Sequence, residues 1–212
     1  MKNTKIEHSI NKGNLILVNK SHPYKEKNQL ELIPISNNKN GISLNANAAT
    51  VFNYMMQDMH YQEKIIPVSG YRTLEEQRNI FYQTMKAHGE IYTRKYVALP
   101  GCSEHQTGYA IDLTWKSGDE DFICPDFPTE GICEDFRQRA SFYGYIERYP
   151  KGKEEITGIG YEPWHFRYVG YPHSEIMKKA AMTLEEYIVY IRAYRFEEND
   201  LKIEQYNKCI EV

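Results

Sequence analysis

The chain contains two histidines and one aspartate whose side chains could bind a single metal ion, His105, Asp112 and His165. A catalytic zinc usually takes three protein ligands of these types and leaves one position open for water. Glu162 stands three residues before His165, and a carboxylate so close to a ligand could accept a proton from a metal-bound water. A histidine in a polar loop is more often a solvated surface residue, so these residue types alone allow metal-assisted hydrolysis without establishing it.

Four further residues could complete such a site. Arg72 stands immediately before a predicted helix, where its charge could stabilise an oxyanion or simply form an ion pair. Ser103 could bind a substrate or close a turn, and Gln77 could face either the same cleft or solvent. The indole of Trp164 favours core packing, although it could also form a wall of the metal pocket.

The segments that lead to these residues have the patterns of short strands and amphipathic helices. LILVNK at 15–20 predicts a strand, and helically spaced apolar residues predict a helix over about 44–62. KIIPVSGYR predicts a strand that ends in a glycine turn. Thr73 and Glu76 then form a capping-box signature, which predicts a helix over about 74–87 with Gly89 at its end.

The run YAIDLTW at 109–115 alternates like a strand with one face on the core, so Ile111 and Leu113 should point inward and Asp112 away. His105 and Asp112 are an odd number of residues apart, which would place them on opposite faces of one straight strand. The chain must therefore turn or bulge at Thr107-Gly108 if both residues bind one ion.

In the second ligand segment, EPWHFRYVG, one regular strand would place Glu162 and His165 on opposite faces. Glu162 should lie in a loop end and His165 in the strand, with Pro163 at the boundary. A helix over 134–143, a strand over 144–149 and a last helix capped by Thr183 complete the predicted elements. The loop over 116–131 is long for a connection, and we hypothesise that it gates the pocket.

The composition limits the class of protein. A length of 212 residues favours one compact domain, and a net charge of -3 gives no positive field for nucleic-acid binding. The amino terminus has neither an export signal nor an apolar span, so we expect no membrane anchor and a cytoplasmic location. Cys102, Cys124, Cys133 and Cys209 lack metal-knuckle spacing and are expected to be thiols, with Cys124 and Cys133 the pair to suspect if the chain were exported.

Three segments carry a resemblance to a known family. They are Ser69-Gly70-Tyr71-Arg72 with Gln77, the run SEHQTGYAID at 103–112, and Glu162-Pro163-Trp164-His165. In that order they resemble the S-G-Y-R, S-x-H-x-x-G-x-A-x-D and E-x-W-H signatures of the zinc D-alanyl-D-alanine peptidases of the VanX and VanY kind. The longer runs VALPGCSEHQTGYAID and EITGIGYEPWHFRYVGYPHS are similar to the bifunctional VanXY enzymes of glycopeptide resistance.

The resemblance implies a role for each motif residue. It assigns His105, Asp112 and His165 as zinc ligands, Glu162 as base, Arg72 as the cation that polarises the carbonyl, and Ser103 and Gln77 as neighbours of the substrate. It implies an α+β fold in which a small antiparallel sheet carries one zinc ion and helices pack on one side. The domain would span 1–212, with a core at about 15–190 and a tail over 193–212 that receives no role.

The implied activity is hydrolysis of the D-alanyl-D-alanine dipeptide and removal of the terminal D-alanine from peptidoglycan precursor pentapeptides. A first alternative is a general cell-wall carboxypeptidase of the same fold, with D,D or L,D specificity, or a phage-type endopeptidase. A second alternative is a zinc-stabilised binding module without catalysis. Such a module needs no base, so the presence of Glu162 and Arg72 favours an enzyme.

Overall fold

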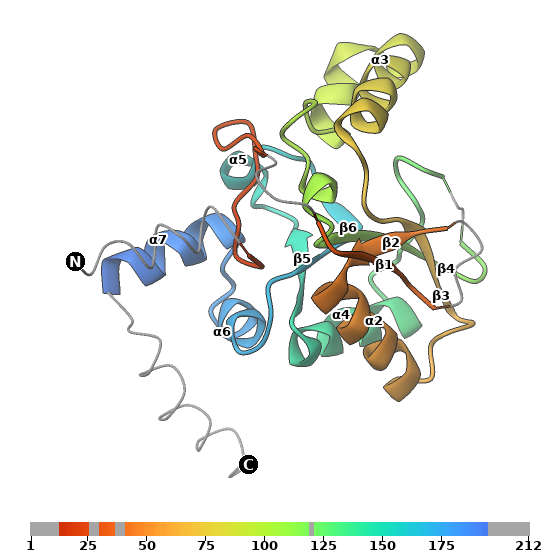
Figure 1. Cartoon of the computed structure of the whole chain (residues 1–212), viewed down its shortest axis with the longest axis vertical. Helices are drawn as coiled ribbons and strands as arrows, with labels where there is room; N and C mark the ends of the chain where they lie inside the picture. Colours follow the sequence, from red (N-terminus) through yellow and green to blue (C-terminus); the bar gives the residue numbers. More distant parts are fainter. Residues whose placement is uncertain (1–12, 26–29, 37–40, 119–120, 195–212) are drawn as a thin grey trace.

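The centre of the protein is a four-stranded antiparallel sheet with the strand order β3-β4-β6-β5. The computed structural model describes residues 13–25, 30–36, 41–118 and 121–194. The strands are β3 (Ile65–Ser69), β4 (Ala110–Trp115), β5 (Tyr145–Tyr149) and β6 (Glu162–Tyr168). A two-stranded sheet of β1 (Leu32–Pro34) and β2 (Ser43–Asn45) lies beside it (Figure 1). The two inner strands, β4 and β6, are the ones that carry Asp112 and His165.

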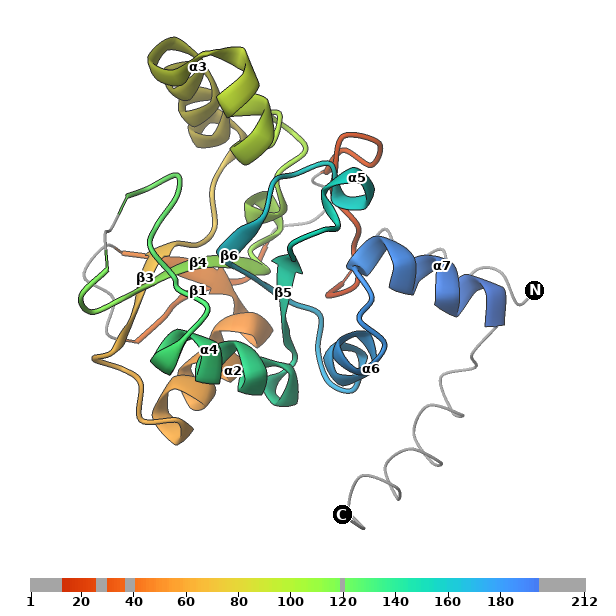
Figure 2. The same ribbon diagram turned by 180° about the vertical axis from the view of Figure 1, so that it is seen from behind.

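One face of the four-stranded sheet packs on helices α2 (Ala46–Asp58) and α4 (Gly131–Arg139), which lie on the same side of the sheet in both views (Figures 1 and 2). Ile111, Leu113 and Phe166 are fully buried there, together with Phe52 of α2 and Phe136 of α4. Burial of each such side chain contributes about 1.5–3 kcal/mol relative to exposure. This core fixes the face of β4 and β6 from which Asp112 and His165 project.

The opposite face carries α3 (Leu74–Tyr96), which protrudes from the body of the protein, and the 3-10 helix η1 (Glu104–Thr107) (Figure 1). The predicted capping box is confirmed, since the Thr73 hydroxyl accepts from the backbone of Glu76 while the Glu76 carboxylate accepts from the backbone of Thr73. Gly89, with φ 80° and ψ 176°, interrupts the helix as expected, but helical structure resumes and continues to Tyr96.

A second group of buried residues joins the carboxyl-terminal helices to the sheet. Helix α6 (His173–Lys179) and helix α7 (Leu184–Tyr194) bury Met177, Leu184, Tyr187 and Ile188 against Leu15 and Leu17. The predicted Thr183 cap of α7 is confirmed by hydrogen bonds in both directions with Glu186. The remaining short helices are η2 (Ala140–Tyr143) and α5 (Glu154–Thr157).

The strand predicted over 15–20 is wrong. Leu15, Leu17 and Val18 are buried as an apolar run should be, but the backbone there has only an isolated bridge between Asn19 and His22. The carbonyls of Asn14 and Ile16 instead accept hydrogen bonds from the Arg167 guanidinium, at 2.9 and 2.8 Å. A side chain thus satisfies the backbone groups that a neighbouring strand would otherwise bind.

The other predicted elements are observed with shifted bounds. The helix predicted over 44–62 is α2, and the helix predicted over 134–143 begins at Gly131 and continues from Ala140 as a 3-10 turn. The sheet β1–β2 and the helices α5 and α6 were not predicted from the sequence. Cys102, Cys124 and Cys133 are free thiols. The amino-terminal residues 1–12, Cys209 and the tail from 195 lie outside the described residues.

Candidate active site

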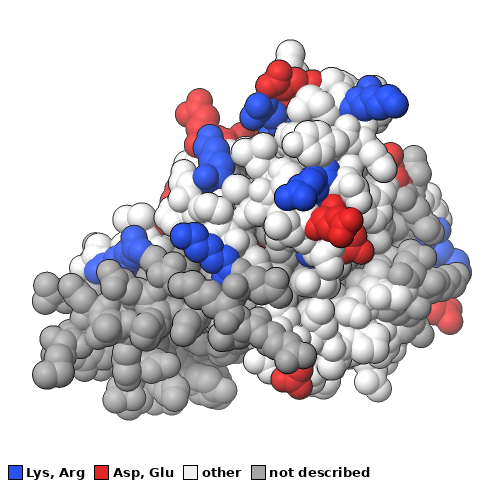
Figure 3. All heavy atoms as spheres, turned by 45° about the horizontal axis from the view of Figure 1, so that its top comes forward, with Lys and Arg blue, Asp and Glu red and all other residues white. Residues whose placement is uncertain are grey.

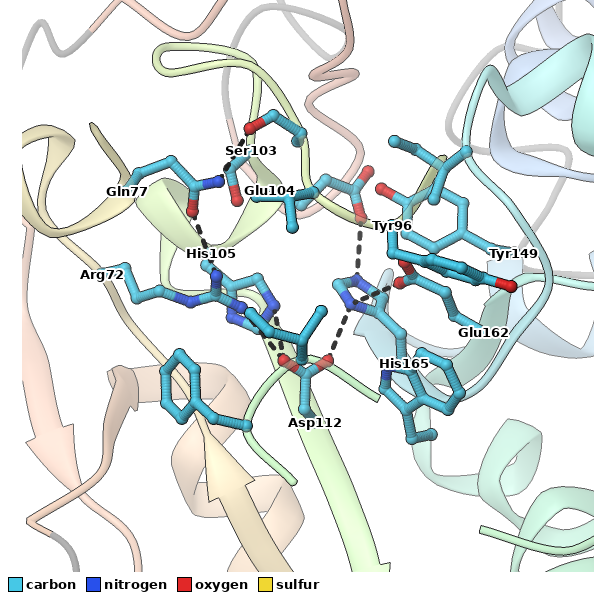
Figure 4. A pocket seen from close by; sticks show the side chains of 16 residues that line it. Arg72, Gln77, Tyr96, Ser103, Glu104, His105, Asp112, Tyr149, Glu162 and His165 are labelled. Carbon is cyan, nitrogen blue, oxygen red and sulfur yellow. Dashed lines mark hydrogen bonds and ion pairs between the residues drawn. The ribbon is translucent and has the colours of Figure 1, made fainter. Parts of the chain in front are cut away.

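His105, Asp112 and His165 meet in a pocket on the sheet face opposite the main core (Figure 4). All three are buried, and one potential ligand atom from each lies within 4.8 Å of the other two. The space between the lining side chains amounts to about 430 Å³, which includes the solvent at the open mouth of the pocket. Arg72, Gln77, Ser103, Glu162 and Trp164, the other five residues selected from the sequence, also line it.

Two strands and a turn bring the three residues together. Asp112 on β4 is paired directly with His165 on β6. His105 comes from η1, which ends at Gly108 with φ 72°, so the turn required between His105 and Asp112 is present. A Cβ on Gly108 would approach the backbone nitrogen of Asn45 to 2.8 Å, so both the conformation and the space at this turn require glycine.

Glu162 reaches the same side as His165 by a route that differs from the predicted one. The expectation that Glu162 lies in a loop end is wrong, because Glu162 is the first residue of β6 and pairs with Tyr149. Between the pairs Glu147–Phe166 and Tyr149–Glu162, β5 advances by two residues (147 to 149) and β6 by four (162 to 166). The register of β5 and β6 therefore shifts within this interval, and Glu162 and His165 both line the pocket.

The histidines present defined ring nitrogens to the pocket. Nδ1 of His105 lies 2.7 Å from the Gly70 carbonyl, an acceptor, so this nitrogen carries the proton and leaves Nε2 as the ligand atom. Nε2 of His105 lies 3.1 Å from Oδ2 of Asp112, and Nδ1 of His165 lies 2.9 Å from Oδ1. Both imidazoles therefore direct one nitrogen toward the same carboxylate.

These residues fit a metal ion. Oδ1 of Asp112 is buried and has no hydrogen-bond partner among the described residues, although Nδ1 of His165 is only 2.9 Å away. Such a contact without hydrogen-bond geometry is what remains when two ligand atoms point toward a common cation. Two imidazoles and one carboxylate also leave the open coordination position that a catalytic metal needs.

Charge and burial shift the acid–base properties of the site. Burial and the neighbouring Arg72 lower the pKa of His105 to about 4. Burial also disfavours the charged form of His165, but Asp112 beside it raises the pKa of His165 to about 9. Despite burial, the two histidines hold the pKa of Asp112 below its usual range. Burial raises the pKa of Glu162 to about 8, close to the value that suits a proton acceptor at neutral pH.

Arg72 is fixed at the edge of the site by three hydrogen bonds. Its Nε donates to the Ser69 hydroxyl at 3.1 Å, Nη1 to Oε1 of Gln77 at 3.1 Å and Nη2 to Oδ2 of Asp112 at 3.0 Å (Figure 4). Gln77 is itself held, because its Nε2 donates to the Ala98 carbonyl at 2.8 Å. A guanidinium has five N–H groups, so two of them remain for a ligand.

Further lining residues carry no distinctive sequence signal. The ring centre of Phe122, from the loop over 116–131, lies 5.6 Å from the Arg72 guanidinium carbon. Ile123, the next residue, also lines the pocket. Tyr149 of β5 places its ring 4.8 Å from that of His165. Glu104 is an acid completely buried beside His105, which its position in a polar loop did not indicate. Together with Trp164 these residues form much of the pocket wall.

On the face shown in Figure 3, basic and acidic side chains of the described residues are interspersed, with wide uncharged areas between them. Within the described ranges, no helix has the length and apolarity that crossing a bilayer requires.

The family model of VanY, D-alanyl-D-alanine carboxypeptidase, matches residues 41–171. The bifunctional D-Ala-D-Ala dipeptidase and D-Ala-D-Ala carboxypeptidase VanXYC of Enterococcus gallinarum is 44% identical over 181 residues, which cover 84% of this chain and 94% of that protein. The crystal structure of the D,D-dipeptidase VanXYg, in complex with a D-Ala-D-Ala phosphinate analogue, matches with a TM-score of 0.85 and 49% identity over 91% of this chain and 76% of that one. The LD-carboxypeptidase LdcB matches with a TM-score of 0.65 and 34% identity, over 81% and 83%.

Proposed function

Because the chain belongs to the VanY family of D-alanyl-D-alanine carboxypeptidases, we propose that it is a zinc-dependent D,D-peptidase with two substrates. These are the D-alanyl-D-alanine dipeptide and peptidoglycan precursor pentapeptides, from which it removes the terminal D-alanine. Because both reactions remove the terminal D-alanyl-D-alanine that glycopeptides such as vancomycin bind, the enzyme would confer resistance to them. The observation that carries the proposal is the convergence of His105, Asp112 and His165 beside Glu162 and Arg72 in one pocket.

His105, Asp112 and His165 would hold one zinc ion, for which imidazole and carboxylate are ordinary ligands. When bound, zinc lowers the pKa of a water molecule and polarises a carbonyl group. Oε2 of Glu162 lies 3.7 Å from Nδ1 of His165, so the base stands next to the metal position. Glu162 accepts the proton of the attacking water and delivers it to the nitrogen of the departing D-alanine.

Arg72 stabilises the oxygen of the scissile carbonyl as negative charge develops there. Its three hydrogen bonds fix the guanidinium plane before the substrate arrives, so no reorganisation is needed during the reaction. Gln77 holds Arg72 in place, while Ser103 and Trp164, which also line the pocket, contact the substrate. The aromatic walls keep water from competing for these donors.

Three peptides test whether the enzyme has D,D or L,D specificity. Product release is measured from D-alanyl-D-alanine, from a precursor pentapeptide and from a tetrapeptide with an L,D terminal bond, by separating the freed amino acid chromatographically. We expect hydrolysis of the first two only. Cleavage confined to the tetrapeptide would support instead the L,D-carboxypeptidase activity named for the structural relative LdcB.

The metal is tested on the same substrates. Dialysis against a chelator should abolish hydrolysis, and one equivalent of zinc should restore it. Hydrolysis that survives complete removal of metal would contradict the assigned ligands. A protein that binds zinc but cleaves none of the three peptides would favour the binding module.

A further inference from the structure

Glu104 is completely buried next to His105 and lies between two buried arginines. Its Oε1 accepts a hydrogen bond from Nε of Arg148 at 2.8 Å and lies 2.7 Å from Nη1 of Arg167. All three side chains have an exposed fraction of 0%. Burying a carboxylate costs several kcal/mol unless charged partners compensate, and the two arginines supply that compensation. The acid is therefore held in an ionised state in a fixed position.

The other oxygen of Glu104 faces a metal-site histidine. Oε2 of Glu104 lies 3.8 Å from Nε2 of His165 (Figure 4). Both atoms are buried, and neither has a hydrogen-bond partner among the residues that the structure describes. A movement of less than about 1 Å brings the two within hydrogen-bond distance. An unsatisfied buried N–H and a nearby unsatisfied carboxylate oxygen each cost free energy that such a bond recovers.

The ring nitrogens of His165 then have separate tasks. Nδ1 faces Asp112 and Glu162 in the pocket, whereas Nε2 faces Glu104 on the opposite edge of the ring. A neutral imidazole carries its proton on one nitrogen, and with a metal ion at Nδ1 that nitrogen is Nε2, where the Glu104 carboxylate can accept its hydrogen bond. The lone pair is thereby kept on Nδ1, where a metal ion needs it.

We propose that Glu104 is a positioning residue that fixes the tautomer and ring orientation of His165, and that Arg148 and Arg167 hold Glu104 for this task. The inference rests on the proposed zinc site and adds a residue that touches neither substrate nor metal. Helix α7 also supports this arrangement. Nη1 and Nη2 of Arg148 donate to Glu185 of α7 at 2.9 and 2.7 Å, so α7 anchors the arginine from outside.

The test is the variant Glu104→Gln. The amide keeps the size of the side chain, but its NH2 group must face either an arginine or the Nε2–H of His165, and both are donors. Zinc affinity is measured by competition with a chromophoric chelator, on protein whose folding is checked by circular dichroism. We expect affinity to fall by about 10–100-fold, the range for loss of a hydrogen-bond partner to a metal-binding histidine.

A matched control separates positioning from general stability. Glu175 is also a buried glutamate, which accepts a hydrogen bond from Ser141 and does not line the pocket. Glu175→Gln should bind zinc with the affinity of the unmodified protein, whatever its melting temperature. Folded Glu104→Gln protein with unchanged zinc affinity would overturn the inference. An unmodified protein that binds no zinc would refute the proposed metal site instead.

A measurement on the unmodified protein covers the case in which Glu104→Gln does not fold. The imidazole nitrogen resonances of the ¹⁵N-labelled, zinc-loaded protein show which ring nitrogen binds the metal and which retains a proton. We expect one histidine bound through Nε2 and one through Nδ1, the latter with a protonated Nε2 that exchanges slowly. Two histidines both bound through Nε2 would overturn the assignment for His165.

Discussion

Replacing Arg72 by lysine tests whether the guanidinium itself acts on the developing oxyanion. Lysine keeps the charge, but one ammonium group cannot hold the Ser69 hydroxyl, Oε1 of Gln77 and Oδ2 of Asp112 as the planar fork does. The two guanidinium N–H groups left for the substrate are absent from lysine, and its ammonium group has no comparable fixed direction. Removal of one preorganised oxyanion donor lowers kcat by about 10²–10³, or about 2.7–4 kcal/mol in activation free energy.

We expect Arg72→Lys to show this fall in kcat with a small change in KM, because the interaction strengthens in the transition state. Initial rates with D-alanyl-D-alanine give both constants, and metal analysis must confirm a full zinc content, since Arg72 also contacts a ligand. Arg94→Lys is the control, because Arg94 is exposed, forms an ion pair with Glu90 and does not line the pocket. A kcat for Arg72→Lys within about threefold of the unmodified enzyme would refute the oxyanion role.

Three other perturbations have equally definite outcomes. Glu162→Gln should retain zinc and melting behaviour while kcat falls by about 10²–10⁴ or more, and turnover at the original rate would remove Glu162 from the mechanism. Gly108→Ala combines a left-handed backbone with a 2.8 Å contact to the Asn45 backbone, so thermal unfolding should show a loss of about 2–5 kcal/mol in the free energy of unfolding. Gly131 has φ 57° and open space around it, so the free energy of unfolding of Gly131→Ala should fall by only about 1 kcal/mol. Shortening the loop over 116–131, which places Phe122 and Ile123 in the pocket wall, should change the ratio of dipeptide to pentapeptide hydrolysis, and an unchanged ratio would show that the loop does not gate the site.

The sequence predicted the parts of the fold that depend on local patterns. The alternation in β4 placed Ile111 and Leu113 in the core and Asp112 in the pocket, and the odd spacing to His105 required the turn that Gly108 makes. The capping boxes at Thr73 and Thr183 located two helix starts to the residue. Each of these conclusions needed only neighbouring residues and the geometry of one element.

The features that the sequence did not predict depend on residues far apart in the chain. The segment over 15–20 has the composition of a strand, but Arg167, about 150 positions later, binds its carbonyls. The sequence pattern around Glu104 indicated an ordinary acid in a loop, because its partners Arg148 and Arg167 lie far along the chain on strands β5 and β6. The position of Glu162 was explained wrongly since a bulge depends on the register of β5 as well as on β6.

That bulge limits how the site can be transplanted. Glu162 and His165 are three residues apart in β6, and a regular strand would direct two such side chains to opposite faces. Both line the pocket in this protein, and the register between β5 and β6 shifts in the same interval, where β6 advances by four residues and β5 by two. A designer who grafts the tetrapeptide Glu162-Pro163-Trp164-His165 onto another sheet must therefore also graft β5, the edge strand next to β6. The structural unit to transfer is therefore the pair of adjacent strands β5 and β6 with its register shift, and not the tetrapeptide alone.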